Sequence, residues 1–233
     1  MNVEKGSGLK YSYLIVVANL LLSVLSYPLL PDRVIIHWGT GGVPDGYGSK
    51  LTGALLMPLV QLVILGLFYV IPHIDPQKKI KASTKYFSRI MNLILVYFLF
   101  FNGVFIAQNL GFEFNMNTVM FPAVGVLLFI LGGFISEAEL NWFVGVRTPW
   151  TLSNEEVWRS THEKAGILFK ISGVITVLGL LVPKYSVWLL LVSVFSTTIY
   201  LFVFSFTEYR RLEAKKPSLL RSRLGRVIDL TEL

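Results

Sequence analysis

The polar side chains with the most chemical capacity gather in one segment, residues 141–166, between two strongly apolar parts of the chain. This segment interleaves tryptophans with charged residues and a histidine, and two glutamates come just before it. Tryptophan and arginine are the residue types that most often dominate the binding energy of protein interfaces. Two interpretations therefore stay open: a well-capped connector at a membrane surface, and a docking surface for a protein partner. The residues concerned are Glu137, Glu139, Trp142, Arg147, Trp150, Glu155, Glu156, Trp158, Arg159, His162, Glu163 and Lys164.

A second polar segment, residues 31–50, is rich in glycine and proline and predicts tight turns. His37 and Asp45 are too few ligands for a metal site, and Tyr47 follows Gly46 where a phosphate-binding loop needs lysine. The chain has no cysteine, which excludes disulfides, thiolate zinc sites and a cysteine nucleophile. No catalytic set stands out, so we expect no enzyme activity, no metal and no cofactor. The segment is expected to form a compact, turn-rich cap that is structural or faces a ligand.

The composition is typical of a membrane protein, because 54% of the 233 residues are hydrophobic and 15% are charged, against about 25% charged residues in soluble domains. Apolar runs of about 20 residues match the hydrocarbon core of a bilayer. The first run also fits a signal peptide, but no small-residue cleavage site follows it, which favours a retained span. We expect an all-α, polytopic bundle with six transmembrane helices at residues 11–30, 51–74, 90–110, 118–136, 167–182 and 187–206. We divide the chain into membrane regions 1–111 and 112–206 and a basic tail, 207–233.

Lysine and arginine predict the orientation, because they accumulate on the cytoplasmic side of membranes. With the N-terminus inside, the inner segments hold 17 of these residues and the outer segments hold three. This distribution places both termini, the basic loop 75–89 and the 141–166 segment in the cytoplasm, and residues 31–50 outside the cell membrane. The tail is expected to contact anionic lipid, where each Lys or Arg contributes about 1 kcal/mol, rather than nucleic acid.

The predicted spans carry no Asp or Glu near their middle, which argues against a proton or ion pump. Asn102 and Asn109 lie on one helix face and predict hydrogen bonds between helices. Lys170 is expected either to extend its side chain back to the membrane surface or to pair with Glu137 or Glu139. Small residues allow close helix contacts, and we expect this role for Gly132, Gly133, Gly166 and Gly173.

Local signals predict that the 141–166 segment begins as a loop and ends as a helix. The residue before Pro149 is pushed out of helical geometry. Ser153 and Glu156 have the spacing of a capping box, which predicts a helix start at Ser153. Trp158 and His162 share one face of that helix. Since tryptophan prefers the headgroup level, we expect the segment to lie along the inner membrane surface before the fifth span.

The 141–166 segment closely resembles the signature of the SdpI family of bacterial membrane proteins. In that family an Asn precedes Gly-hydrophobic-Arg-Thr-Pro-Trp-Thr-Leu, and an Asn-Glu-Glu-Val-Trp-like run and a His follow. Residues 31–50 look like the N-terminal membrane domain of unknown function that often precedes this signature, and the two patterns cover most of residues 11–183. The signature residues are Asn141, Gly145, Arg147, Thr148, Pro149, Trp150, Thr151, Leu152, Asn154, Glu155, Glu156, Val157, Trp158 and His162; those of the first domain are Pro31, His37, Trp38, Gly42 and Asp45.

The resemblance implies an immunity protein that protects a cell from a secreted, membrane-acting peptide toxin. It also implies a signal transducer that holds a cytoplasmic transcriptional repressor at the membrane. Under this hypothesis the toxin is recognised from outside by residues 31–50, with Gly46 added to the toxin-facing residues named above. The 141–166 segment then binds the cytoplasmic partner, and the protein itself makes no direct contact with nucleic acid.

Two other classes of function compete with immunity. A secondary transporter or exporter of a peptide or lipid would use polar residues within the spans, such as Gln61. A membrane-embedded enzyme would place its active site at His37 and Asp45, or at Arg147 and His162.

Overall fold

Six long apolar helices, each able to cross a membrane, form the body of the protein within the residues that the structure describes. The structure is a computed structural model that describes residues 4–74 and 84–229, with side chains described for 9–74 and 86–215. The predicted membrane bundle is confirmed, and the chain is a multi-pass membrane protein. Most of the predicted basic loop 75–89 lies outside the described residues. The helices are α1 (Glu4–Ser26), α2 (Lys50–Ile74), α4 (Thr84–Asn109), α5 (Met116–Ser136), the short α6 (Pro149–Ser153), α7 (Glu155–Leu178) and α8 (Ser186–Asp229).

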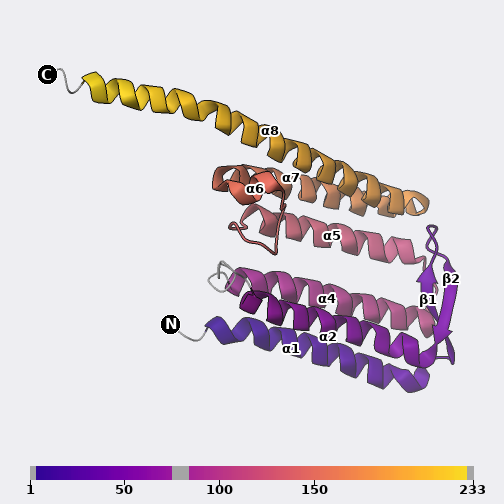
Figure 1. Cartoon of the computed structure of the whole chain (residues 1–233). Helices are drawn as coiled ribbons and strands as arrows, with labels where there is room; N and C mark the ends of the chain where they lie inside the picture. Colours follow the sequence, from indigo (N-terminus) through magenta and orange to yellow (C-terminus); the bar gives the residue numbers. More distant parts are fainter. Residues whose placement is uncertain (1–3, 75–83, 230–233) are drawn as a thin grey trace.

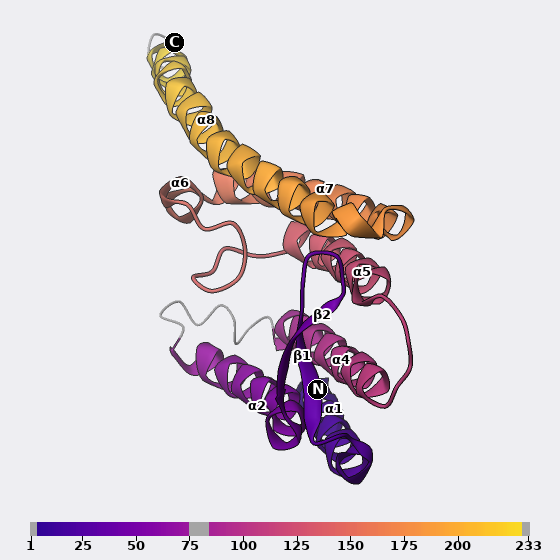
Figure 2. The same cartoon turned by 90° about the vertical axis from the view of Figure 1, so that its right-hand side faces the viewer.

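The long helices run side by side, with α1, α2 and α4 in one group and α5, α7 and α8 in the other (Figure 1). Large apolar side chains cover the outside of the bundle, and on α8 both Val192 and Phe195 are 61% exposed. Lipid is the solvent that such a surface requires. Figure 2 shows the same two groups seen from the hairpin end, with the loop before α6 lying between them.

Buried amides join the helices of the first group. The Asn102 side chain on α4 is fully buried, and its Nδ2 donates to Asn19 Oδ1 at 2.7 Å and to Ser23 Oγ at 2.9 Å on α1. Gln61 Nε2 on α2 donates to the Leu95 carbonyl of α4 at 2.7 Å. Hydrogen bonds of this kind stabilise helix association where the hydrophobic effect contributes little. The predicted role of Asn102 is confirmed.

Glycines bring α5 and α7 into backbone contact, and this is the most extensive helix pair in the described structure. A Cβ added at Gly125 would lie 2.6 Å from the Gly173 carbonyl oxygen, and one added at Gly132 would lie 2.7 Å from the Gly166 carbonyl oxygen. The prediction is confirmed for three of the four glycines. Gly133 differs, since its nearest neighbour is the Lys170 Cε at 3.9 Å.

A β-hairpin covers the end of the bundle opposite the N- and C-terminal ends of the chain (Figure 1). Strand β1 (Arg33–Trp38) pairs antiparallel with β2 (Pro44–Ser49). The turn-rich composition predicts a cap here but not its two strands. The segment Arg33–Trp38 is rich in β-branched and aromatic residues, which favour a strand. The glycines and prolines lie in the tip of the hairpin and in its second strand.

The predicted position of the N-terminal part of α7, along the inner membrane surface, is wrong. Residues 155–166 do not form a separate segment along the membrane surface, because α7 is one uninterrupted helix from Glu155 to Leu178. Its buried residues include Trp158 and His162, so this part of the helix packs against the protein. Helix α8 likewise continues past the predicted end of the sixth span at 206 to Asp229. The proposed division of the chain at residues 111 and 206 stays a prediction.

Candidate functional site

The loop between α5 and α7, residues 137–154, is called the signature loop below, and Asn141 organises its first turn. The Asn141 Oδ1 accepts the backbone N–H groups of Phe143 and Val144 at 2.8 and 2.7 Å. Its Nδ2 donates to the carbonyls of Glu139 and Val144 at 2.8 and 2.9 Å. Asn141 is 7% exposed. One buried side-chain amide therefore forms hydrogen bonds to both sides of this turn.

His162 connects the signature loop to α7. Its ring stacks on Trp158, with centroids 3.9 Å apart and an interplanar angle of 19°. Its Nε2 accepts the Val146 N–H at 3.0 Å, so Nδ1 carries the proton and donates to the Trp158 carbonyl at 2.8 Å. Gly145 lies at the edge of the ring, in front of Nε2, with φ +121°, and a Cβ there would lie 2.2 Å from Nε2. The histidine is thus a neutral structural residue with both nitrogens bonded.

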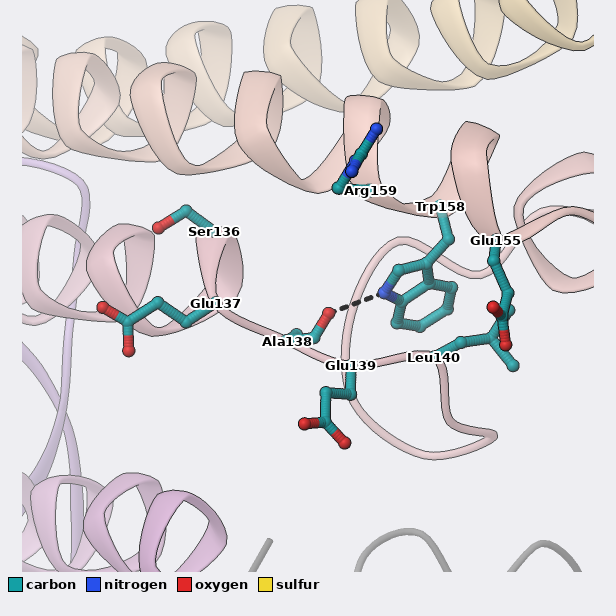
Figure 3. A pocket seen from close by; sticks show the side chains of 8 residues that line it. All are labelled: Ser136, Glu137, Ala138, Glu139, Leu140, Glu155, Trp158 and Arg159. Atoms are coloured by element: carbon teal, nitrogen blue, oxygen red, sulfur yellow. Dashed lines mark hydrogen bonds between the residues drawn. The ribbon is translucent and has the colours of Figure 1, made fainter. Parts of the chain in front are cut away.

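Trp158 fixes the end of α5. Its indole Nε1 donates to the Ala138 carbonyl at 2.7 Å, and the side chain is 2% exposed (Figure 3). The sequence predicts this tryptophan at the headgroup level. It is buried instead, because its indole bonds to Ala138 just after α5 and its ring stacks on His162.

The short helix α6 is the part of the signature loop that contacts α8. Thr148 and Thr151 form a reciprocal capping box around α6, and both are buried. The Thr148 hydroxyl donates to Ser205 Oγ on α8 at 3.1 Å. Trp150 packs on two phenylalanines of α8, with ring centroids 5.1 Å from Phe202 and 5.0 Å from Phe206.

Helix α7 is capped by Asn154, and the predicted cap at Ser153 is wrong. Asn154 Oδ1 accepts the N–H groups of Glu156 and Val157 at 2.9 and 3.2 Å. Ser153 belongs to the end of α6, where its hydroxyl donates to the Trp150 carbonyl at 3.1 Å. One residue, Asn154, separates α6 from α7. Asparagine is one of the residue types preferred at the N-cap of a helix.

Some residues of the signature loop and the start of α7 are exposed, and others are buried. Arg147 is exposed, and its Nη1 donates to the Trp142 carbonyl at 2.5 Å. Trp142 is 46% exposed, and Pro149, Glu155 and Glu156 also face outward. A partner could reach these side chains, whereas Asn141, Thr148, Thr151, Trp158 and His162 are buried within the protein.

A pocket of about 420 Å³ opens between the end of α5 and the start of α7. Figure 3 shows glutamate side chains from both sides of it, with Trp158 forming its inner wall. Its charged side chains are three glutamates and one arginine, so it is acidic. The lining residues are Ser136, Glu137, Ala138, Glu139, Leu140, Glu155, Trp158 and Arg159.

The toxin-facing residues predicted at the other end have different environments. His37 and Asp45 are exposed and joined by a 2.5 Å contact between Nδ1 and Oδ1 across the hairpin. Trp38 points inward, where its Nε1 donates to Gln108 Oε1 at 2.6 Å and its ring lies edge-on to Phe101 and Phe105.

The remaining three predicted residues occupy different parts of the hairpin region. Pro31 is exposed before β1. A Cβ at Gly46 would lie 2.7 Å from the His37 Cβ, and Gly42 is buried at the hairpin tip with φ +75°.

Two predictions about the spans have mixed outcomes. Asn109 binds the hairpin rather than another helix: its Oδ1 accepts the Ile35 N–H at 2.7 Å and its Nδ2 donates to the Ile35 carbonyl at 3.2 Å. Asn109 is the last residue of α4, which explains the difference. Among the described residues, no ion pair joins Lys170 to Glu137 or Glu139, and its stem runs beside Gly132 and Gly133.

Residues that the sequence analysis missed include Asn115 and Asn117, which bind the hairpin tip, and Ser205, which accepts from Thr148. Their partners are more than 50 residues away in the chain, so no local pattern marks them. Within the part of the chain that the structure describes, no group of three or more His, Cys, Asp or Glu residues is arranged to hold a metal ion.

The fold and the site define a multi-pass helical membrane protein with a hairpin at one end and a tightly bonded polar loop at the other. Residues 137–205 match the SdpI/YfhL protein family, and residues 14–62 match a domain of unknown function (DUF1648). The chain is 31% identical over 206 residues to the "Immunity protein SdpI" of Bacillus subtilis (strain 168), which covers 88% of this chain and 97% of that protein. It therefore belongs to the SdpI/YfhL family.

A shorter match covers the N-terminal part. It is 35% identical over 48 residues to the "Uncharacterized membrane protein YbgB" of the same organism, covering 21% of this chain and 53% of that protein. No solved structure matches the chain.

Proposed function

We propose that this protein is an SdpI-like immunity protein of the cell membrane, which protects the cell that makes it from a secreted peptide toxin. The observation that carries this proposal is the likeness to an immunity protein over nearly its whole length. A non-enzymatic role agrees with the site, because the histidine and tryptophan of the signature loop are buried and bonded to the protein itself.

The arrangement of the two polar regions supports a receptor that also signals. The hairpin and the signature loop lie at opposite ends of the bundle (Figure 1). In the orientation favoured by the lysine and arginine distribution, the hairpin faces the outside and both termini and the signature loop face the cytoplasm. Toxin would then bind at the exposed side of the hairpin, where His37 and Asp45 lie.

The surface offered to a cytoplasmic protein would be the exposed part of the signature loop. Arg147 and Trp142 provide a cation and an aromatic ring there, the residue types that dominate binding energy in interfaces. The acidic pocket is lined in part by Glu137 and Glu139 of the same loop and would favour a partner with basic side chains, because opposite charges steer association. A transcriptional repressor that binds DNA fits this requirement, since such proteins carry basic surfaces.

The proposal is tested in toxin-sensitive cells that express the wild-type chain, Arg147→Ala or Lys164→Ala at equal membrane levels. Lys164 is the control because it is also an exposed cation, on α7, but lies outside the signature loop. We expect survival with the wild type and with Lys164→Ala. Killing of cells that contain the wild-type protein would contradict the immunity function. Loss of a toxin-induced reporter signal with Arg147→Ala, but not with Lys164→Ala, would connect the signature loop to the partner.

A transporter is the second candidate, and buried amide atoms without a hydrogen-bond partner favour it. These atoms are Gln61 Oε1, Asn102 Oδ1 and Asn19 Nδ2, all in the first helix group. Polar groups in a bundle interior often mark a pathway for a substrate. Liposomes that contain the wild type or Gln61→Leu test this function: peptide or lipid flux that requires Gln61 would favour transport over binding alone.

A further inference from the structure

The tip of the hairpin is bonded to the start of α5, although the hairpin belongs to the N-terminal half of the chain. Three consecutive carbonyls of the tip accept hydrogen bonds from three consecutive residues. Asn117 Nδ2 donates to Thr40 at 2.8 Å, Asn115 Nδ2 to Gly41 at 2.8 Å, and the Met116 N–H to Gly42 at 3.2 Å. We call this contact, residues 40–42 with 115–117, the α5 latch.

The α5 latch is closely fitted. A Cβ added at Gly42 would lie 2.1 Å from Asn115 Oδ1, and the φ of +75° at this residue favours glycine. Asn117 is 5% exposed, and its Nδ2 also donates to the Pro183 carbonyl in the turn between α7 and α8 at 3.0 Å. One side chain therefore joins the hairpin, α5 and the turn between α7 and α8.

Strand β1 of the hairpin is bonded to the first helix group. Trp38 donates to Gln108, and Ile35 exchanges two hydrogen bonds with Asn109 near the end of α4. At the opposite end of the bundle, the Tyr86 hydroxyl of α4 donates to the Phe134 carbonyl of α5. The hairpin is thus a strap that holds the two helix groups together at the end where a ligand would bind.

Helix α5 connects the α5 latch to the signature loop. It cannot shift sideways without α7, because their backbones touch at Gly125 and Gly173 and again at Gly132 and Gly166. Just beyond its far end, the Ala138 carbonyl accepts the Trp158 indole N–H. A displacement of the start of α5 would therefore be passed along the packed helices α5 and α7 to the stack that holds the signature loop.

We propose that the α5 latch couples the hairpin to the signature loop: while closed it keeps the loop bonded, and a ligand that binds the hairpin and opens the latch loosens the loop. This inference deepens the proposed function and rests on it for the identity of the ligand. A ligand shifts such an equilibrium only through its different affinities for the two states. Couplings between sites typically change affinity by about 5- to 150-fold.

The test measures the accessibility of the signature loop and needs neither toxin nor partner. Since the chain has no cysteine, Ala138→Cys introduces a single thiol at a buried position of the loop, 8% exposed. Maleimide alkylation of this thiol is followed in membrane vesicles. The latch is opened from one side by Asn117→Leu, which removes both donors, and from the other by Gly42→Ala. Gly41→Ala is the matched control, because a Cβ there meets nothing within 4 Å.

We expect both latch variants to raise the alkylation rate at position 138 by about 5-fold or more, and Gly41→Ala to leave it unchanged. A second thiol, Ser88→Cys on α4, reports whether the whole bundle has loosened, since Ser88 is 9% exposed in the other helix group. An unchanged rate at 138, or an equal rise at 88 and 138, would overturn the latch. Immunity of the wild type is scored separately in cells, so that result tests the proposed function without affecting this one.

Discussion

His162 occupies the space into which any side chain at position 145 would project. The two residues lie on different elements, Gly145 in the signature loop and His162 on α7, and a Cβ at 145 would lie 2.2 Å from the ring nitrogen. That nitrogen accepts the N–H of the neighbouring Val146. The glycine and the histidine of the signature are therefore one structural unit, in which the absence of a side chain allows the backbone hydrogen bond.

The first prediction is that Gly145→Ala destabilises the signature loop. Alanine at φ +121° is strained by about 1–3 kcal/mol, and its Cβ would also displace the His162 ring. We expect a lower midpoint of thermal unfolding in detergent and faster proteolysis within residues 137–154. Gly66→Ala is the control, because that glycine lies in helix α2 and a Cβ added there would meet nothing within 4 Å. Equal midpoints for the two variants would contradict the role of Gly145.

A second prediction separates the stacking of His162 from its hydrogen bonding. His162→Phe keeps an aromatic ring over Trp158 but leaves the Val146 N–H without an acceptor. An unsatisfied donor costs about 1–3 kcal/mol when it is fully buried, and Val146 is half-buried. We expect a thermal midpoint below that of the wild type, with faster amide hydrogen exchange at Val146. Exchange at Val146 as slow as in the wild type would show that the histidine nitrogen is not its acceptor.

The third prediction concerns the contact between α5 and α7. Gly173→Leu places a side chain against the Gly125 carbonyl oxygen, which lies 2.5 Å from the position of a Cβ. This neighbour is backbone, so the helices have to separate, and we expect little protein to accumulate in the membrane. A Cβ added at Gly103 on α4 would meet nothing within 4 Å, so Gly103→Leu should accumulate normally. Quantitative immunoblots of membrane fractions measure both.

The fourth prediction concerns which side of the membrane the hairpin and the start of α7 face. Val43→Cys places a thiol at the hairpin tip, where the native side chain is 65% exposed, and Glu156→Cys places one on the exposed face of α7. A membrane-impermeant maleimide added to intact cells should label position 43 at once and position 156 only after permeabilisation. The reverse pattern would put the signature loop outside and remove the basis for a cytoplasmic partner.

Some parts of the site could be predicted because the signal is local. Trp158 and His162 are four residues apart, so a helix places them on one face, and the structure stacks them. Small residues within the spans predicted close helix contacts, and Gly132, Gly166 and Gly173 make them between α5 and α7. The cap of α7 could not be assigned in the same way, because Ser153 and Asn154 are both good capping residues. The structure decides between them, because α6 ends at Ser153 and Asn154 is the residue that directly precedes α7.

The long-range contacts of the site could not be predicted. Trp158 was expected at the membrane surface because tryptophan commonly lies there, but its environment depends on where α5 ends relative to α7. Likewise the Asn117 side chain has partners 66 and 77 residues away, and nothing near it in the sequence distinguishes it from an ordinary helix-start residue.

The sequence by itself determined that this chain crosses the membrane with six helices, since length and hydropathy are properties of each segment alone. It also determined the family, because the signature is a contiguous run of residues. The tertiary structure decided which signature residues face inward and which remain available to a partner, and it decided that the hairpin joins the two helix groups. Those outcomes depend on the distance between elements remote in the chain, which packing sets and no single segment encodes.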